Sequence, residues 1–324
     1  MFSRHILLVS AILLVLFVSL VGIASATEEN GAVGIDPNLF FALVFAYCVA
    51  IGCITQIAGT GGGVIFTTLT LGFTNIHPDI VRATGLLAAM SGTRMSARRF
   101  LRRGLANIRI ILLVGVTYTL FAVIGAIIGL EITRTLGDFG VALIKFLLGI
   151  LILIVGVLYI IMKRVDYPEV KSVDKFTEKL GLEFPYWEES LQGVVNYKVR
   201  RAWLAILLFC GVGLISGMFG LGAGWAVTPV LNLVMSTPLK VATASSVTII
   251  SLGDTAAVFP YLMSNSLIPI FAVPAVAGLM TGAEMGSRIA VKVKPGFVRY
   301  VLIGILLFAG AKLVITGLSL MGVI

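Results

Sequence analysis

Long apolar segments that carry almost no charge constrain the fold of this 324-residue chain more than any other feature. Several are close to twenty residues long, the length that a helix needs to cross the hydrocarbon core of a bilayer. Only 12% of the residues are charged, whereas soluble domains carry about twice that fraction. A soluble fold would have to bury too many such segments. We therefore predict an all-α polytopic membrane protein in the lipid bilayer of the cell (plasma or inner) membrane.

Basic residues outnumber acidic ones, with 24 Lys and Arg against 15 Asp and Glu. They cluster between the apolar segments, above all at 98–109 and in the polar segment 163–201. Cationic turns between membrane helices stay on the cytoplasmic side, so we interpret the charge as a topological signal and predict no nucleic-acid partner. Segment 163–201 is predicted to be a cytoplasmic loop, either a solvated connector or one with an interfacial helix near residues 184–187.

Residues 1–26 have the pattern of a signal peptide. Arg4 precedes an apolar stretch at 6–23, and Ala24-Ser25-Ala26 forms a small-residue cleavage site. The apolar stretch is long for a signal peptide, so an uncleaved first transmembrane helix is the alternative.

Two glycine runs interrupt the apolar segments, one in each half of the chain. They are Gly59-Thr60-Gly61-Gly62-Gly63 and Gly220-Leu221-Gly222-Ala223-Gly224. Each glycine destabilises a helix by about 1 kcal/mol relative to alanine, so each run must break a helix. Within a bilayer, broken backbone is tolerated only where protein or a water-filled cavity covers it. We therefore predict that each run forms a buried, non-helical tip, the kind of position where carriers bind their substrates.

The order of segments after the two runs is the same. A short apolar segment (64–73 or 225–235) follows each run, and long apolar segments come next. Similar residues stand at matching places, as in Gly125-Ala126 and Gly282-Ala283. We predict two transmembrane repeats, 38–162 and 202–320, each a glycine-tipped broken or re-entrant helical hairpin plus three transmembrane helices. The number of crossings per repeat is odd whether the short segments cross or re-enter, so the copies are predicted to be inverted.

The tips also indicate a ligand. The first N–H groups of a helix have no intrahelical partner and carry partial positive charge, so helices starting at Val64 and Trp225 would each point a positive end at a tip. Two such ends near the middle of the membrane would bind a small anion. The alternative is that the glycines only permit tight helix crossings. The candidate substrate-binding residues are Gln56, Gly59, Thr60, Gly61, Gly62, Gly63, Thr84, Ser216, Gly220, Gly222, Gly224 and Thr243.

Charged residues within the predicted spans are few. Asp254 is the clearest case, because ionisable groups inside a membrane are functional candidates. Arg94 occupies nearly the corresponding place in the first repeat. Both are coupling candidates: either they pair across the two repeats, or Asp254 carries a coupling proton. Alternatively, both lie near helix ends and face water.

Nothing in the sequence indicates catalysis. The chain has no HExxH motif, its two histidines have no partner at ligand spacing, and the glycine runs lack the Gly-Lys-Ser/Thr ending of a phosphate-binding loop. Cys48, Cys53 and Cys210 show no metal-binding spacing. We therefore predict a protein that is not an enzyme, with no catalytic residue, no cofactor and no metal site.

At the glycine runs the chain resembles the sulfite exporter TauE/SafE family of membrane permeases. That family repeats a pattern of roughly G-x-G-G-G-x(4)-P-x-L, followed by A-x-x-T/S. The first copy matches the glycines at 59–63, with Thr67 and Thr68 near the place of the proline. The second copy keeps Pro229 and Leu231, with Ala223 in place of one glycine. The later part is matched by Ala83-Thr84 and Ala242-Thr243-Ala244-Ser245, so the resemblance covers residues 38–320.

The resemblance implies a secondary carrier of small anions, often sulfur oxyanions or organosulfonates: sulfite, thiosulfate, sulfoacetate and taurine-related sulfonates. This agrees with the anion-binding tips inferred from the helix ends. We therefore predict transport of such an anion by alternating access. An uncoupled anion channel and a non-transporting membrane scaffold or assembly factor are the alternatives, and a homo-oligomer is left open.

Overall fold

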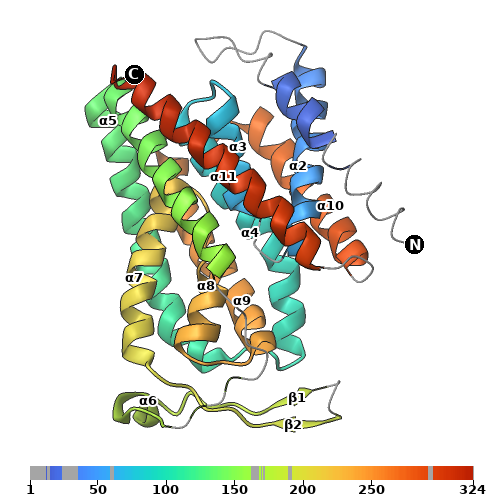
Figure 1. Ribbon diagram of the computed structural model, residues 1–324, viewed down its shortest axis with the longest axis vertical. Coiled ribbons are helices and arrows are strands. Elements are labelled where there is room, and N and C mark those ends of the chain that lie inside the picture. Colours follow the sequence, from blue (N-terminus) through green and yellow to red (C-terminus); the bar gives the residue numbers. More distant parts are fainter. Residues whose placement is uncertain are drawn as a thin grey trace.

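The computed structural model describes residues 12, 15–23, 36–58, 62–161, 168, 170, 172–188, 192–290 and 295–323. Long helices pack together in one bundle, and a short helix with a two-stranded hairpin lies at one end of it (Figure 1). The first half contains α2 (Pro37–Ala58), α3 (Gly62–Phe73), α4 (Pro78–Arg102) and α5 (Ile108–Ile161). The second half contains α7 (Ala202–Phe219), α8 (Val227–Pro229), the π-helix η1 (Val230–Val234), α9 (Leu239–Met263), α10 (Pro269–Ala290) and α11 (Pro295–Leu320).

The predicted all-α membrane fold is confirmed. Six of the described helices are long and apolar enough to cross a membrane, namely α2, α5, α7, α9, α10 and α11. α5 reverses at Gly137, which has non-helical backbone angles, and a Cβ at Gly140 would lie 2.3 Å from the Ile132 carbonyl oxygen. α5 therefore supplies two antiparallel limbs. α4 has 25 residues but is not among the six, because charged residues occur along its whole length, from Asp79 and Arg82 to the arginines of its last turns.

The first glycine run joins α2 to α3, and α3 runs back alongside α2. The hydroxyl of Tyr47 in α2 lies 3.1 Å from Thr70 Oγ1, and the Tyr47 ring lies 6.1 Å from the Phe66 ring. At 1.5 Å per residue the 12 residues of α3 rise about 18 Å, little more than half the hydrocarbon thickness. Residues 63–72 are all buried, so protein covers this short helix on every side. The first predicted hairpin is therefore present, with a short helix that turns back beside a long one.

The second glycine run ends α7 and leads into a less regular segment. Gly220 (φ 67°) and Gly222 (φ 65°) adopt the left-handed backbone conformation that favours glycine. Only the three residues of α8 and the π-turn η1 follow, so the regular half-length helix that we predicted to start at Trp225 is wrong. Pro229 explains the difference, because it has no N–H to donate to the Trp225 carbonyl. That carbonyl instead accepts from the Tyr159 hydroxyl at 3.4 Å.

Glycines let helices of the two halves pack in reciprocal pairs. α2 packs against α10, where a Cβ at Gly282 would lie 2.2 Å from the Val49 carbonyl oxygen. α7 packs against the first limb of α5, where a Cβ at Gly125 would lie 2.1 Å from the Leu214 carbonyl oxygen. In each half, the long helix that leads into the glycine tip (α2 or α7) therefore packs against a matching glycine in the other half (Gly282 or Gly125). This supports a duplication, while the inverted relation of the two copies stays a prediction.

The segment between the halves forms a small unit at one end of the bundle. It contains α6 (Lys175–Leu180) and the antiparallel strands β1 (Tyr186–Glu188) and β2 (Gly193–Val195). Asn107, in the turn between α4 and α5, donates to the Leu182 carbonyl and to the Tyr197 hydroxyl, both at 2.7 Å. The cationic turn at 98–109 and this unit therefore meet at the same end, which we call the basic end.

Of the two alternatives for the segment near residues 184–187, the interfacial helix is wrong, because strand β1 occupies part of these residues. Tyr186 is buried against the bundle whereas Trp187 is exposed, which is the alternation of a strand rather than the stripe of a helix. The Tyr186 ring packs edge-on against that of Tyr197, with ring centroids 6.2 Å apart.

Within the N-terminal 26 residues, the structure describes a helix at 15–23. Leu16, Leu20 and Ile23 are buried on one of its faces, and a Cβ at Gly22 would lie 3.1 Å from the Leu43 side chain of α2. The expected cleavage site at 24–26 lies outside the described residues, so cleavage stays a prediction.

Candidate functional site

The two glycine tips touch each other inside the bundle. A Cβ at Gly63 would lie 2.4 Å from the Leu221 carbonyl oxygen, so a larger residue could not stand there. Thr67 of α3 donates its hydroxyl to the Gly220 carbonyl at 2.8 Å. Gly85 of α4 completes the contact, because a Cβ there would lie within 2.5 Å of both the Thr67 hydroxyl and the Gly220 carbonyl oxygen. The two helix breaks, which are far apart in the sequence, therefore meet in one place, which we call the junction.

A cavity of about 140 Å³ lies at this junction, and we call it the tip cavity. Gly62 of the first tip and Gly224 of the second both form its wall, together with residues of α2, α4, α9 and α10. The wall residues include no charged side chain among those that the structure describes. Its polar side chains all carry hydroxyl groups: Thr55, Thr93, Ser96, Thr228, Thr243 and Ser246.

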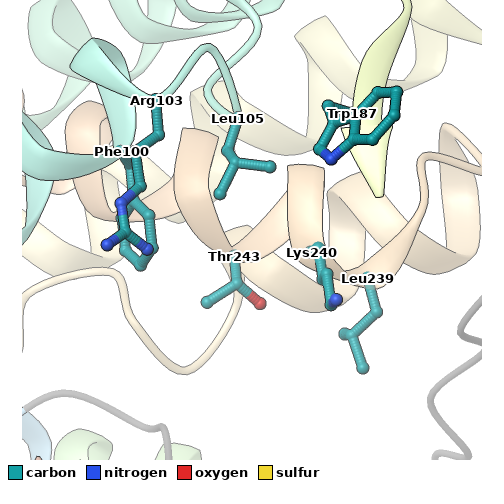
Figure 2. Close-up of a pocket in the computed structure, with 7 residues that line it drawn as sticks. All are labelled: Phe100, Arg103, Leu105, Trp187, Leu239, Lys240 and Thr243. Atoms are coloured by element: carbon teal, nitrogen blue, oxygen red, sulfur yellow. The ribbon is translucent and has the colours of Figure 1, made fainter. Parts of the chain in front are cut away.

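A larger cavity of about 630 Å³ adjoins the tip cavity at the basic end, and we call it the vestibule (Figure 2). Phe100 and Thr243 belong to the walls of both cavities. Arg103 and Lys240 bring two cations to the vestibule, and no acidic residue is among its described wall residues. A cationic mouth raises the local concentration of anions. The charged residues at the described entrance to the tip cavity are therefore both basic.

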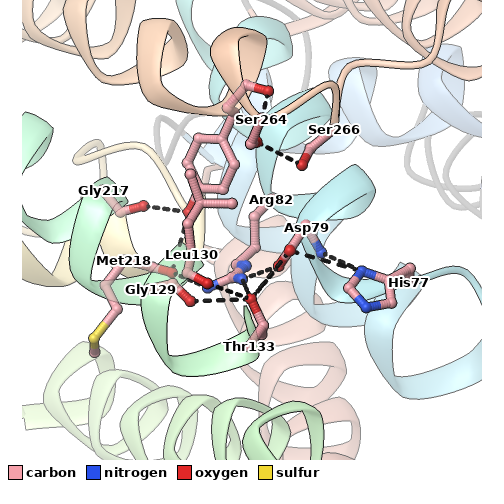
Figure 3. A network of polar contacts seen from close by, with 11 residues as sticks. His77, Asp79, Arg82, Gly129, Leu130, Thr133, Gly217, Met218, Ser264 and Ser266 are labelled. Atoms are coloured by element: carbon pink, nitrogen blue, oxygen red, sulfur yellow. Dashed lines mark hydrogen bonds and ion pairs between the residues drawn. The ribbon is translucent and has the colours of Figure 1, made fainter. Parts of the chain in front are cut away.

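A polar network closes the bundle on the other side of the tips, which we call the far end (Figure 3). Arg82 of α4 is fully buried and donates to the Met218 carbonyl of α7 at 2.9 Å and to the Asp79 carboxylate. Thr133 of α5 lies 3.0 Å from each Asp79 carboxylate oxygen. Tyr261 of α9 donates to the Gly217 carbonyl at 2.9 Å, and its ring centroid lies 5.6 Å from the Arg82 guanidinium. Four helices are thus tied together around one buried cation.

Asp254 lies between the tip cavity and the far-end network. It is fully buried, and one of its carboxylate oxygens accepts from the Tyr118 hydroxyl, which also lies 2.9 Å from Ser216 Oγ. The other oxygen has no hydrogen-bond partner, and it would lie 3.0 Å from a Cβ at Gly222. Ile250, one helical turn earlier, lines the tip cavity. A buried carboxylate without a cation is stabilised by taking up a proton or a counter-ion.

The structure does not support the proposed pairing of Asp254 with Arg94. Arg94 is exposed, and no ion pair joins the two residues, both of which the structure describes. The alternative that Asp254 faces water is also wrong, because its side chain is fully buried between Tyr118 of α5 and Gly222 of the second tip.

The structure places some of the sequence-predicted site residues at the tip cavity and others elsewhere. Gly62, Gly224 and Thr243 line the tip cavity, and Gly63, Gly220 and Gly222 shape the junction beside it. Ser216 contacts Tyr118 on the side of Asp254, and Thr84 is buried with its hydroxyl unpartnered. Gly59, Thr60 and Gly61, and the side chain of Gln56, lie outside the described residues.

The sequence analysis did not identify Arg82 or most of the hydroxyl residues in the wall of the tip cavity. Arg82 had a usable signal, because it is a charge inside a predicted span with Asp79 one turn earlier. The hydroxyl residues Thr93 and Ser96 of α4, and Thr243 and Ser246 of α9, each follow a spacing of three, which places them on one helical face. Small hydroxyl residues are common in membrane helices, so that spacing alone would not have identified the cavity.

Comparison with known proteins agrees with this architecture. The family model described as "Sulfite exporter TauE/SafE" matches residues 43–313. A curated relative, "Probable membrane transporter protein YunE" of Bacillus subtilis (strain 168), is 21% identical over 289 residues, which is 86% of this chain and 98% of that protein. No solved structure gives a significant match. The matched region takes in both glycine tips and most of the apolar helices, and this multi-pass protein of the cell membrane belongs to the sulfite exporter TauE/SafE family of membrane transport proteins.

Proposed function

We propose that this protein is a secondary transporter of small anions and that the tip cavity is its substrate site. The observation that carries the proposal is that both glycine tips, through Gly62 and Gly224, wall one cavity. α3 begins at Gly62, so its first N–H groups, which have no intrahelical partner, and the positive end of its dipole adjoin the cavity. Hydroxyl groups form the rest of the polar wall. Those of Thr55 and Thr93 donate to carbonyls of their own helices, while a wall that carries hydroxyl groups and no charged side chain of its own suits a small anion. No enzymatic activity is part of the proposal.

The size of the tip cavity favours a small solute. At about 140 Å³ it is well below the 300–1,000 Å³ of pockets that hold drug-sized ligands. The family description names sulfite export, which supports a sulfur oxyanion or an organosulfonate. Sulfite, thiosulfate, sulfoacetate and taurine-related sulfonates are the proposed substrates.

Alternating access is the proposed mechanism. The tip cavity adjoins the vestibule at the basic end, while the Arg82 network closes the far end. The reciprocal packing of α2 on α10 and of α7 on α5 supports two inverted repeats, a plan that lets one bundle rock against the other around a central site. In the state described here the substrate site would exchange with the cytoplasm.

Asp254 is the proposed coupling residue. Its unpartnered oxygen lies beside Gly222 at the second tip, so a charged carboxylate would repel an anion bound there. A proton on Asp254 removes that repulsion, and by linkage a bound anion favours the proton equally. Tyr118 is the titratable group in contact with this carboxylate. We therefore propose that a proton and an anion move together.

Counterflow in proteoliposomes tests the proposed function. Purified protein is reconstituted into vesicles loaded with unlabelled sulfite, and entry of ³⁵S-labelled sulfite is measured against vesicles without internal sulfite. A carrier shows faster entry of label when sulfite is present inside, because the loaded site returns faster than the empty one. An uncoupled channel shows flux without this stimulation, and a scaffold shows no flux above protein-free vesicles. Either of the last two results would refute the proposal.

A further inference from the structure

Arg82 is a buried cation that the transport site described above does not use. Its side chain is fully buried in α4, on the far-end side of the second tip, where a Cβ at Gly220 would lie 2.4 Å from the Arg82 Cα. A buried guanidinium is costly unless a negative group and further acceptors satisfy it. Asp79, on the preceding turn of the same helix, provides the negative group.

The surroundings of the Asp79 carboxylate have the chemistry of an oxyanion site. One of its oxygens accepts from Arg82 Nη2, and both lie 3.0 Å from the Thr133 hydroxyl. A cation together with a hydroxyl donor, placed on the two oxygens of one anion, is a common way to bind carboxylates, sulfonates and sulfite-like anions. The site is therefore already built, and a side chain of the protein occupies it.

Asp79 fills this site incompletely. Arg82 Nη1 donates to the Met218 carbonyl, and Nη2 donates to Asp79 and, at 3.3 Å, to the Thr133 hydroxyl oxygen. Nε has no hydrogen-bond partner although the side chain is fully buried. Nε and Nη2 form one edge of the guanidinium, the edge that binds an oxyanion through two parallel hydrogen bonds. Asp79 is tethered three residues away on the same helix and reaches only Nη2. A free oxyanion has no such tether and would use the whole edge.

Asp79 also lies on the solvent side of the pair. Its side chain is 16% exposed whereas that of Arg82 is 0% exposed. Asp79 is the second residue of α4, which begins after the 74–77 turn. Its backbone N–H donates a hydrogen bond to His77 Nδ1 at 3.3 Å. A small rearrangement of this helix start would withdraw the carboxylate and present Arg82 to the far end.

We propose that the Asp79 carboxylate is an internal stand-in for the transported anion. When the far end opens, an oxyanion of the proposed substrate class takes its place on Arg82 and Thr133, and these residues form a second binding station in the pathway. This inference rests on the proposed function. It assigns Arg82 as the residue that binds the anion from the far side and Asp79 as its competitor.

The test is Asp79→Asn, which removes the competing charge and keeps the shape of the side chain. Uptake of ³⁵S-sulfite is measured in right-side-out vesicles, which present the far end, and in inside-out vesicles, which present the basic end. The half-saturating sulfite concentration should fall about tenfold at the far end and stay unchanged at the basic end. Asp138→Asn is the matched control, since it neutralises an exposed carboxylate beside the Gly137 reversal and should change neither value.

Two further measurements keep the inference falsifiable if Asp79→Asn folds poorly. Thr133→Val keeps the ion pair but removes the hydroxyl, and should raise the far-end half-saturating concentration several-fold. In detergent, sulfite should raise the melting temperature of Asp79→Asn more than that of the wild type, because the anion replaces a lost partner of Arg82. Unchanged far-end half-saturation in both variants, with no extra stabilisation by sulfite, would overturn the second station. Absence of counterflow in the wild type would instead overturn the proposed function, and stabilisation of Asp79→Asn by sulfite would still report the Arg82 site.

Discussion

Filling the tip cavity without disturbing the fold is the most informative perturbation that the structure offers. Gly92 of α4 lines the cavity, and a Cβ added there meets no atom within 4 Å. Gly92→Leu therefore places its new side chain in open space within the site. Gly304→Leu is the matched control, because Gly304 of α11 also has open space around its Cβ and is not part of the cavity wall.

The magnitude follows from volume. The cavity measures about 140 Å³, and the side chain of leucine fills on the order of 100–150 Å³, the size of cavity that large-to-small substitutions leave behind. No room for an oxyanion then remains. We expect sulfite counterflow to fall about a hundredfold or more, equivalent to at least about 2.7 kcal/mol of lost binding. Stability should not fall, because replacing a glycine in a helix interior gains up to about 1 kcal/mol in helix propensity.

The assay is ³⁵S-sulfite counterflow in proteoliposomes, with melting temperature measured on the same preparations. The expected result is a folded Gly92→Leu variant without counterflow beside a Gly304→Leu variant with wild-type counterflow. Wild-type rates in Gly92→Leu would show that the anion does not pass through the tip cavity. Equal losses in both variants would show that leucine acts through helix packing, and either result would refute the reasoning.

Three further outcomes follow from other parts of the structure. Asp254→Asn should keep sulfite exchange but lose the acceleration of net uptake by a proton gradient, because the amide binds no proton. Gly217→Ala should lower the melting temperature strongly, because the added Cβ would lie 1.9 Å from the Ala122 carbonyl oxygen. Gly211→Ala on the same helix is the control, since its Cβ meets no atom within 4 Å and should leave the melting temperature unchanged. Burial alone would raise the pKa of Asp174, but hydrogen bonds from the Thr177 hydroxyl and from the Arg201 and Thr177 backbone N–H groups outweigh it and lower the pKa. The anchoring of α6 should therefore be intact at neutral pH and loosen as the pH falls below about 4, seen as lower protection factors for the amides of residues 175–180 after correction for the intrinsic exchange rate at each pH.

Each of these outcomes has a clear contrary result. Full proton-gradient dependence in Asp254→Asn would place the coupling proton elsewhere. An unchanged melting temperature in Gly217→Ala would mean that α7 and α5 are not in close backbone contact. Weaker protection of the α6 amides at neutral pH than in acid, after correction for the intrinsic exchange rate at each pH, would contradict the sign argued for Asp174. A group with a lowered pKa contributes stability above its ordinary titration range and loses it in acid.

The membrane fold and both tips could be predicted because they depend on local rules. A run of glycines inside an apolar segment breaks a helix wherever it occurs, and the run at 220–224 does so with two left-handed residues. The match between Gly125 and Gly282 also had a physical meaning, since each glycine admits the backbone of the opposite tip-forming helix. Composition was therefore sufficient for the all-α membrane fold, while the inverted relation of the two repeats stays a prediction.

The chemistry of the site depends on which helices meet, and a sequence does not state this. Asp254 drew attention as an intramembrane acid, but its partner is Tyr118 of α5 rather than Arg94, because α9 packs against α5 at this level. Arg82 lies only three residues from Asp79, yet its role depends on Met218 and Thr133, which come from two other helices. At the second tip Pro229 overrode the expected regular helix.

Locating a bound anion tests the central claim most directly. Selenite is a heavier analogue of sulfite, and anomalous diffraction from crystals of the wild-type protein soaked in selenite would reveal the selenium atom. We predict an anomalous peak within the tip cavity, in hydrogen-bond reach of the backbone at Gly62 and beside Gly224. Crystals that show selenium only at other places, or none at saturating selenite, would contradict the claim that the paired glycine tips bind the transported anion.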